Sequence, residues 1–146
     1  MLWTSTVVVL TLLVAGLTCL LVRGARTSRR CFDALPGSFP CRLRVVSGFV
    51  PGLPHAWTGS SGSAAWVHDA LVLWIGRVTT THVLPVRFPE GAIEPVTSSR
   101  VSGLGSAPST LLLRLDGGSV VEIATAVTHR DLLAGPFLAA CLTRSG

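Results

Sequence analysis

Residues 110–124 read TLLLRLDGGSVVEIA, and they carry the clearest fold signal in the chain. Apolar side chains recur at every second position on both sides of an Asp-Gly-Gly turn: Leu111, Leu113 and Leu115 before it, Val121 and Ile123 after it. Alternation of this kind places one face of a strand against a core. Asp-Gly is a preferred pair for tight hairpin turns. We therefore predict a β-hairpin over residues 110–124.

The residues upstream of this hairpin predict further strands. Residues 41–46 place Leu43 and Val45 on one face and Arg42 and Arg44 on the other. Residues 64–67 and 70–77 flank a turn at His68-Asp69 and predict a second hairpin. In its second strand, Leu71, Leu73 and Ile75 are expected to point inward. Val72 and Trp74 are expected to point outward. We interpret Trp74 as a large strand residue, rather than as a cover for a second layer or a membrane contact.

A further strand is predicted over residues 78–88, where Pro85 indicates a sheet edge or a break. Two stretches predict loops. Residues 47–63 contain Pro51, Pro54 and a Gly/Ser tract, which favours a flexible loop. Residues 89–109 predict a loop with one short strand at 96–101.

The C-terminal segment predicts one helix. Thr128 and Asp131 have the spacing of a capping box ahead of the apolar residues 132–142. Pro136 either kinks this helix or begins a second short segment. The face predicted to pack on the sheet consists of Leu133, Phe137, Ala140 and Cys141.

The order of these elements predicts a mainly-β fold. A bent, barrel-like antiparallel sheet with one C-terminal helix over its open end is the shape of pleckstrin-homology-like domains. Residues 36–44 and the tail 111–139 also resemble an actinobacterial family of short single-pass membrane proteins of unknown function. This resemblance implies a membrane-tethered cytosolic β-domain, and it implies no activity.

The N-terminal segment predicts a membrane anchor. Leu2–Val22 contains no charged residue, and as a helix it measures roughly 31 Å, which is the thickness of a bilayer core. No Lys or Arg precedes it, so a cleavable secretory signal fits poorly. A lipidation signal would have a small residue immediately before the cysteine, whereas Cys19 follows Gly16-Leu17-Thr18 and lies deep in the span. We predict an uncleaved signal anchor over residues 1–23, a basic juxtamembrane neck over 24–40 and the β-domain over 41–146.

Four arginines follow the apolar run: Arg23, Arg26, Arg29 and Arg30. Positive charge beside a span favours the cytoplasmic side, so the N-terminus is expected outside a cell membrane and the domain in the cytoplasm. The arginines also predict contact with anionic lipid headgroups, each contributing on the order of 1 kcal/mol near the surface. The plainer interpretation is a stop-transfer flank with no further role.

Orientation decides the chemistry of the cysteines. In the cytosol Cys31 and Cys41 are expected to be thiols, whereas an extracytoplasmic domain would allow a Cys31–Cys41 disulfide. No cysteine pair has the spacing of a zinc site, and His55, His68, His82 and His129 are scattered, so no metal site is predicted.

Other function classes find little support in the sequence. All twelve basic residues are arginines, but the only dense cluster adjoins the anchor, so nucleic-acid binding is not predicted. Gly59–Ser63 lacks the spacing of a nucleophile elbow, and Gly103-Leu104-Gly105 lacks the third glycine of a dinucleotide loop. No catalytic residue and no cofactor is predicted. We expect a non-catalytic, membrane-anchored interaction module with a protein partner; the alternatives are an extracytoplasmic envelope domain and an enzyme with an unrecognised site.

Overall fold

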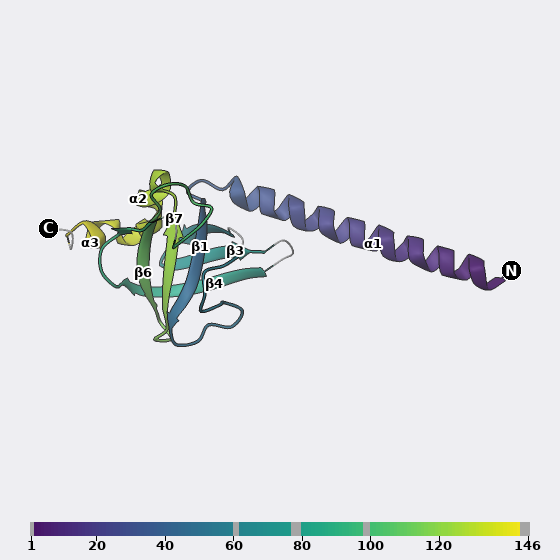
Figure 1. The fold of residues 1–146 in the computed structure, drawn as a ribbon, viewed down its shortest axis with the longest axis horizontal. Coiled ribbons are helices and arrows are strands. Elements are labelled where there is room, and N and C mark those ends of the chain that lie inside the picture. Colours follow the sequence, from purple (N-terminus) through teal and green to yellow (C-terminus); the bar gives the residue numbers. More distant parts are fainter. Residues whose placement is uncertain (1, 60–61, 77–79, 98–99, 144–146) are drawn as a thin grey trace.

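A computed structural model describes residues 2–59, 62–76, 80–97 and 100–143. Helix α1 (Leu2–Asp33) projects away from a β-domain, which begins at Phe39 (Figure 1). The strands are β1 (Phe39–Ser47), β2 (Gly62–Val67), β3 (Ala70–Ile75), β4 (Thr80–Pro89), β5 (Glu94–Pro95), β6 (Ser109–Leu115) and β7 (Val120–Thr125). Within the described residues, four short helical segments follow β7: η1 (Val127–His129), α2 (Arg130–Ala134), η2 (Gly135–Phe137) and α3 (Leu138–Thr143).

The seven strands form one antiparallel sheet in the order β4-β3-β2-β1-β7-β6-β5, and an additional β4–β6 pairing closes it. The predicted hairpin over 110–124 is confirmed as β6–β7, with Leu111 opposite Ile123 and Leu113 opposite Val121. The β2–β3 hairpin and strand β1 are confirmed as well. Closure matters because a closed sheet leaves few unpaired backbone groups for edge-to-edge pairing.

The core lies inside this closed sheet. Its largest members are less than 2% exposed and come from β1, β3, β6, β7 and α2: Phe39, Leu43, Leu71, Leu73, Leu111, Leu113, Ile123 and Leu133. Those on the strands occupy the alternate positions that the period-two pattern assigns to one face, and Leu133 of α2 packs on them. A second, small cluster lies outside β7, where Val101 and Leu104 pack with Ala124.

Pro85 lies within β4, opposite Ala70, and its carbonyl accepts a hydrogen bond from the Asp116 amide at 3.1 Å. The ladder to β6 shifts register between Val86 and Phe88. The sequence analysis predicted either a sheet edge or a break at Pro85, and the shift in register next to it agrees better with a break in regular pairing. Residues 78–79 of this predicted strand, and residue 77 of the strand predicted before it, lie outside the described residues.

The prediction of a flexible loop over 47–63 is only partly right. Residues 48–59 form no strand, but the Val45 amide donates to the Pro54 carbonyl at 2.8 Å and the Thr58 amide donates to Leu43 at 3.1 Å. Leu53 and Thr58 are buried. The loop is held because it supplies acceptors and donors to β1 beyond Cys41, where β1 no longer pairs with β2.

The short strand predicted at 96–101 is wrong. The strand in this region is β5, at Glu94–Pro95, and Val101 instead lies fully buried in an irregular segment. Val101 is buried because it packs against Leu104 and Ala124, not because it pairs in a strand. Residues 98–99 of the predicted strand are outside the described residues.

The C-terminal helix is divided, and Pro136 begins a new segment, as the second interpretation predicted. Gly135 adopts φ +49°, and a Cβ there would lie 2.3 Å from the Trp66 ring, so only glycine fits. The Trp66 indole N–H donates to the Leu132 carbonyl at 3.0 Å, and its ring meets Phe137 edge-on at 5.7 Å.

The predicted capping box is wrong, because His129 is the N-cap of α2 and the Thr128 hydroxyl lies 3.1 Å from His129 Nδ1 instead. Within the predicted packing face, Leu133 and Cys141 are buried and Phe137 is half-buried. Ala140 is exposed, contrary to prediction, because the break at Gly135 changes the helical phase that follows.

Candidate functional site

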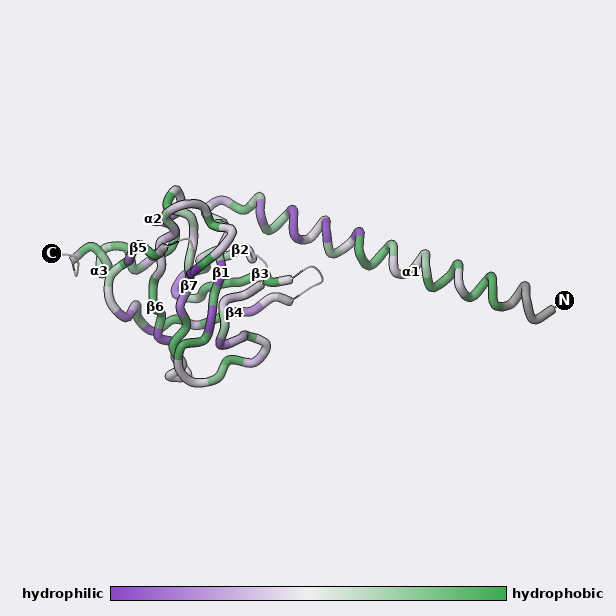
Figure 2. The backbone as a smooth tube through the Cα atoms, in the orientation of Figure 1, coloured by the Kyte–Doolittle hydropathy of each residue, from purple (hydrophilic) through white to green (hydrophobic). Residues whose placement is uncertain are grey.

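The N-terminal helix is long and apolar enough to span a membrane. Its apolar side chains from Val7 to Leu21 are more than half exposed, and none of the most apolar stretch is buried within the protein. Figure 2 shows this hydrophobic half of α1 pointing away from the β-domain and the hydrophilic half adjoining it. Exposure of this much apolar surface to water is unfavourable in free energy, whereas the hydrocarbon core of a bilayer accommodates it.

Helix α1 continues without a break through the first part of the predicted neck and ends at Asp33. Because the helix rises about 1.5 Å per residue, Asp33 lies roughly 16 Å beyond the end of the apolar run at Val22. The β-domain therefore begins close to the end of the apolar segment, and a helix rather than an extended tether makes the connection.

The four candidate lipid-contacting arginines divide into two groups. Arg23, Arg26 and Arg30 are exposed and recur at spacings of three and four residues, so they form one stripe along α1. Arg29 is half-buried, and its Nε lies 3.8 Å from Asp33 Oδ2. Only the first three present their charge on an open helix face; Arg29 belongs to the junction with the β-domain.

The end of α1 contacts the sheet through Phe32 and Asp33. The Phe32 ring lies 6.1 Å from the Trp74 ring of β3, and Ser63 of β2 donates a hydrogen bond to Asp33 Oδ1. The Ser38 hydroxyl donates to the Asp33 backbone carbonyl at 2.8 Å, which satisfies a carbonyl at the helix end. Trp74 lies in β3, as predicted, and is 9% exposed; besides being a strand residue, it is the contact of the sheet with Phe32.

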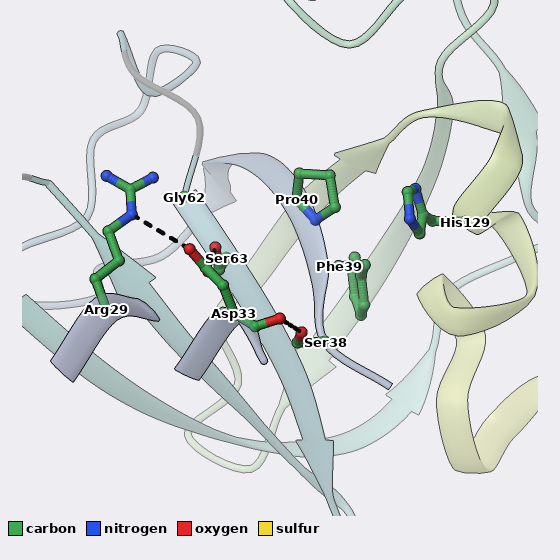
Figure 3. A pocket seen from close by; sticks show the side chains of 8 residues that line it. All are labelled: Arg29, Asp33, Ser38, Phe39, Pro40, Gly62, Ser63 and His129. Atoms are coloured by element: carbon green, nitrogen blue, oxygen red, sulfur yellow. Dashed lines mark hydrogen bonds and ion pairs between the residues drawn. The ribbon is translucent and has the colours of Figure 1, made fainter. Parts of the chain in front are cut away.

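A pocket of about 330 Å³ opens at this junction (Figure 3). Its polar lining comes from five residues of four separate segments: Arg29, Asp33, Ser38, Ser63 and His129. Phe39, Pro40 and Gly62 line the rest. The pocket thus combines a guanidinium, a carboxylate, hydroxyl groups and an imidazole.

The arrangement does not have the geometry of a nucleophilic site. Although Ser63, Asp33 and His129 line one pocket, the Ser63 hydroxyl donates directly to the Asp33 carboxylate, and His129 contacts Thr128. Figure 3 shows His129 separated from Ser63 by Phe39 and Pro40. A general base must lie within hydrogen-bond reach of the hydroxyl that it activates. The pocket is better suited to binding than to covalent catalysis.

The sequence did not predict this pocket. Arg29 was identified only as one of the basic neck residues, and His129 only as a helix-start residue. Asp33 and Ser63 are thirty positions apart, and no motif joins them. The only available signal was the acidic Asp33 four residues after Arg29, which is the spacing of an ion pair on a helix.

The remaining histidines have local roles. His55 Nδ1 lies 3.1 Å from the Val45 carbonyl, His68 occupies the β2–β3 turn with φ 56°, and His82 packs beside Gly52. Among the described residues, no group of three His, Cys, Asp or Glu side chains could hold a metal ion.

Cys31 is exposed on α1, whereas Cys41 is buried in the core, and no disulfide joins them. Burial raises the pKa of the Cys41 thiol to about 12, because the apolar core disfavours the thiolate. Cys41 is therefore an inert core residue in the folded protein.

A second polar hollow, of about 60 Å³, lies over β5, β6 and β7, where Glu90, Glu94 and Glu122 converge. Two of these carboxylates are neutralised by arginines: Arg114 pairs with Glu90, and Arg44 pairs with Glu122. This hollow is consequently a structural ion-pair region.

Comparisons with protein-family models, with curated proteins and with solved structures give no match to this chain. The resemblance to the actinobacterial single-pass family therefore stays a prediction. The site is described by its own geometry: an apolar helix, an exposed arginine stripe and a polar pocket where the helix meets the sheet.

Proposed function

We propose that this chain is a single-pass protein of the cell membrane whose β-domain is a non-catalytic interaction module in the cytoplasm. The observation that carries the proposal is the continuity of α1, which has an exposed apolar half followed by a basic half that ends in contact with the domain. The proposed orientation, with the N-terminus outside, rests on Arg23, Arg26, Arg29 and Arg30 and on the positive-inside rule.

A pleckstrin-homology-like fold is part of this proposal. The closed antiparallel sheet and the helical segments that follow β7 agree with that shape, in which one helix covers an open end of the sheet. Such folds serve as binding scaffolds with many different ligands, so the fold alone selects no partner.

The exposed stripe of Arg23, Arg26 and Arg30 is proposed to lie against anionic headgroups. Arg23 directly follows the apolar run, about 1.5 Å beyond it along the helix axis, whereas Arg30 lies roughly 12 Å beyond it. Since the Debye length is about 8 Å at physiological salt, Arg23 and Arg26 are expected to dominate this attraction. A protein partner would then meet the β-domain through its loops or faces, because the sheet is closed between β4 and β6.

Fusion of a reporter to the C-terminus tests this proposal. A reporter that is active only in the cytoplasm should be active, and one that is active only outside should be silent. The reverse result would contradict the cytoplasmic orientation. Extraction with alkaline carbonate separately tests membrane integration: an integral protein stays in the pellet, and release into the supernatant would contradict the anchor.

The interaction role is tested by crosslinking in intact cells followed by affinity capture of the full chain from detergent-solubilised membranes. A matched variant that carries the helix but replaces the β-domain with an unrelated folded domain serves as the control. A partner captured with the native chain and not with the control supports the module. Identical recoveries from both would count against it.

A further inference from the structure

We propose that the pocket where α1 meets the sheet binds a phosphoethanolamine group, with the phosphate on Arg29 and the ammonium on Asp33. The source that fits best is the headgroup of a membrane lipid. This inference rests on the proposed function, because it requires α1 to span a membrane.

The charges of the pocket favour a ligand that carries both signs. Arg29 and Asp33 lie 3.8 Å apart, which is an ion-pair separation longer than a hydrogen bond, and their side chains are 36% and 45% exposed. An anion alone would bind beside the Asp33 carboxylate, and a cation alone would bind beside the Arg29 guanidinium. A zwitterion satisfies both groups, since guanidinium binds phosphate through charge-assisted hydrogen bonds and a carboxylate accepts from an ammonium.

The order of the two charges along α1 matches the order within a lipid headgroup. Arg29 lies about 10 Å beyond Val22, and Asp33 about 6 Å further from the membrane. In phosphatidylethanolamine the phosphate is attached to the glycerol, and the ammonium lies farther out. The membrane-proximal arginine therefore faces the phosphate, and the distal carboxylate faces the ammonium.

The pocket also lies within reach of the headgroups. Headgroup layers extend about 5–8 Å beyond the hydrocarbon core on each side. Helical side chains lean toward the helix N-terminus, which here is the membrane side, so the long Arg29 side chain shortens the remaining distance. Tilt of the helix, about 20° on average in membranes, brings one face of the neck closer still.

The polar neighbours of the ion pair complete the site. Ser63 donates to Asp33 Oδ1 and thereby holds the carboxylate at the pocket wall. His129, whose ring lines the opposite side, supplies a further polar group. Arg23, Arg26 and Arg30 lie on the exposed stripe of α1 and are absent from the pocket lining. Arg29 is thus distinguished from the other neck arginines by its place.

The test uses the full chain in a maltoside detergent, titrated with short-chain lipids while native mass spectrometry counts the bound lipids. Phosphatidylethanolamine should bind about tenfold more tightly than phosphatidylglycerol, which has the phosphate but no ammonium. Arg29→Ala should weaken phosphatidylethanolamine binding at least about tenfold, because a charge-assisted hydrogen bond is lost. Arg26→Ala removes the same charge from the exposed stripe and should change binding less than about twofold.

Asp33→Asn is the second variant. The asparagine amide oxygen still accepts a hydrogen bond from Ser63, so the junction is expected to keep its fold, which the circular dichroism spectrum and the melting temperature verify. This variant should lose the preference for phosphatidylethanolamine over phosphatidylglycerol. Asp69→Asn, in the exposed β2–β3 turn, is the matched control and should retain it.

Three results would overturn the proposal: equal or tighter binding of phosphatidylglycerol by the native chain, equal effects of Arg29→Ala and Arg26→Ala, or an unchanged preference in Asp33→Asn. Titration with soluble O-phosphoethanolamine distinguishes the two sources of the ligand. If it binds as tightly as the lipid, the pocket is supported but its ligand is a soluble molecule rather than a lipid headgroup. The two proposals fail in different experiments. Release of the chain by alkaline carbonate would contradict the membrane anchor, whereas a chain that stays in the membrane but shows no lipid preference would contradict only the phosphoethanolamine site.

Discussion

The Phe32 ring at the end of α1 lies 6.1 Å from the Trp74 ring of β3, with an angle of 39° between the ring planes. This contact joins the apolar helix to the β-domain across 42 positions of the sequence. Asp33 adds a second attachment through Ser63. The domain is therefore attached to its helix by side-chain contacts, and a rotation of α1 would disturb β2 and β3.

Phe32→Ala should weaken this attachment. Aromatic pairs contribute about 0.5–1.5 kcal/mol beyond the area that they bury, so a double-mutant cycle with Trp74→Ala should yield a coupling energy of about 1 kcal/mol. Denaturant unfolding of the full chain in detergent measures it. Phe49→Ala is the matched control, because Phe49 is 74% exposed and should show no coupling to Trp74. A zero coupling energy for Phe32 would contradict the docked junction.

Gly135→Ala should be strongly destabilising. The backbone there has φ +49°, and the new Cβ would lie 2.3 Å from the Trp66 ring, so both strain and overlap oppose the substitution. We expect a loss of about 2–4 kcal/mol, measured by thermal or denaturant unfolding.

Gly105→Ala is the control for Gly135→Ala, because Gly105 also has a positive φ (+90°) but has open space around its Cβ position. Its cost should be limited to the backbone term, about 1 kcal/mol. Equal losses for the two variants would show that Trp66 does not press on Gly135.

Cys41 should make stability depend on pH in the alkaline range. The folded-state pKa of about 12 exceeds the ordinary value of 9.0, so the unfolded state loses this proton first as the pH rises. The Cys41 contribution is complete below pH 9 and is lost between pH 9 and 12, with a slope of up to about 1.4 kcal/mol per pH unit. Unfolding of the native chain and of Cys41→Ala at pH 8, 9 and 10 measures this slope. A slope unchanged by the substitution would contradict the burial of the thiol.

Glu122→Gln should destabilise the β1–β7 pairing in the middle of the sheet, where Glu122 lies opposite Arg44. Arg44 Nε donates to Glu122 Oε2 at 2.7 Å, and the Arg44 guanidinium lies 5.0 Å from the centre of the Trp57 ring. The pair is partly exposed, so the expected loss is only about 1 kcal/mol and should shrink in high salt. Glu94→Gln, on the short strand β5, is the control and should have little effect. Equal effects of the two substitutions would contradict a specific role for Glu122.

The strands were predictable because their burial follows directly from side-chain alternation. Leu111, Leu113 and Ile123 point inward as the period of two requires, and Asp-Gly-Gly marks the turn between them. The short strand β5 at Glu94–Pro95 was not predictable in this way, and the strand predicted at 96–101 does not form. Val101 is apolar because it packs on Ala124, and packing in an irregular segment leaves no periodic signal.

The candidate site was less predictable than the fold, because it depends on contacts between distant segments. The helix and its arginines follow from local composition, but the separation of Arg29 from Arg23, Arg26 and Arg30 requires the position of Asp33 and the sheet beside it. Likewise, the sequence predicts Trp74 only as a strand residue, because its contact with Phe32 joins positions far apart in the chain. A pocket formed by four segments has no counterpart in any one stretch of sequence.

The orientation of the domain is tested most directly by labelling Cys31, which is exposed just beyond the proposed span. Cys41 serves as an internal control, because burial should protect it until the domain unfolds. A membrane-impermeant maleimide should leave Cys31 unlabelled in intact cells and should label it in permeabilised cells, as read by mass spectrometry of the Cys31 peptide. Labelling of Cys31 in intact cells would place the domain outside and contradict the account.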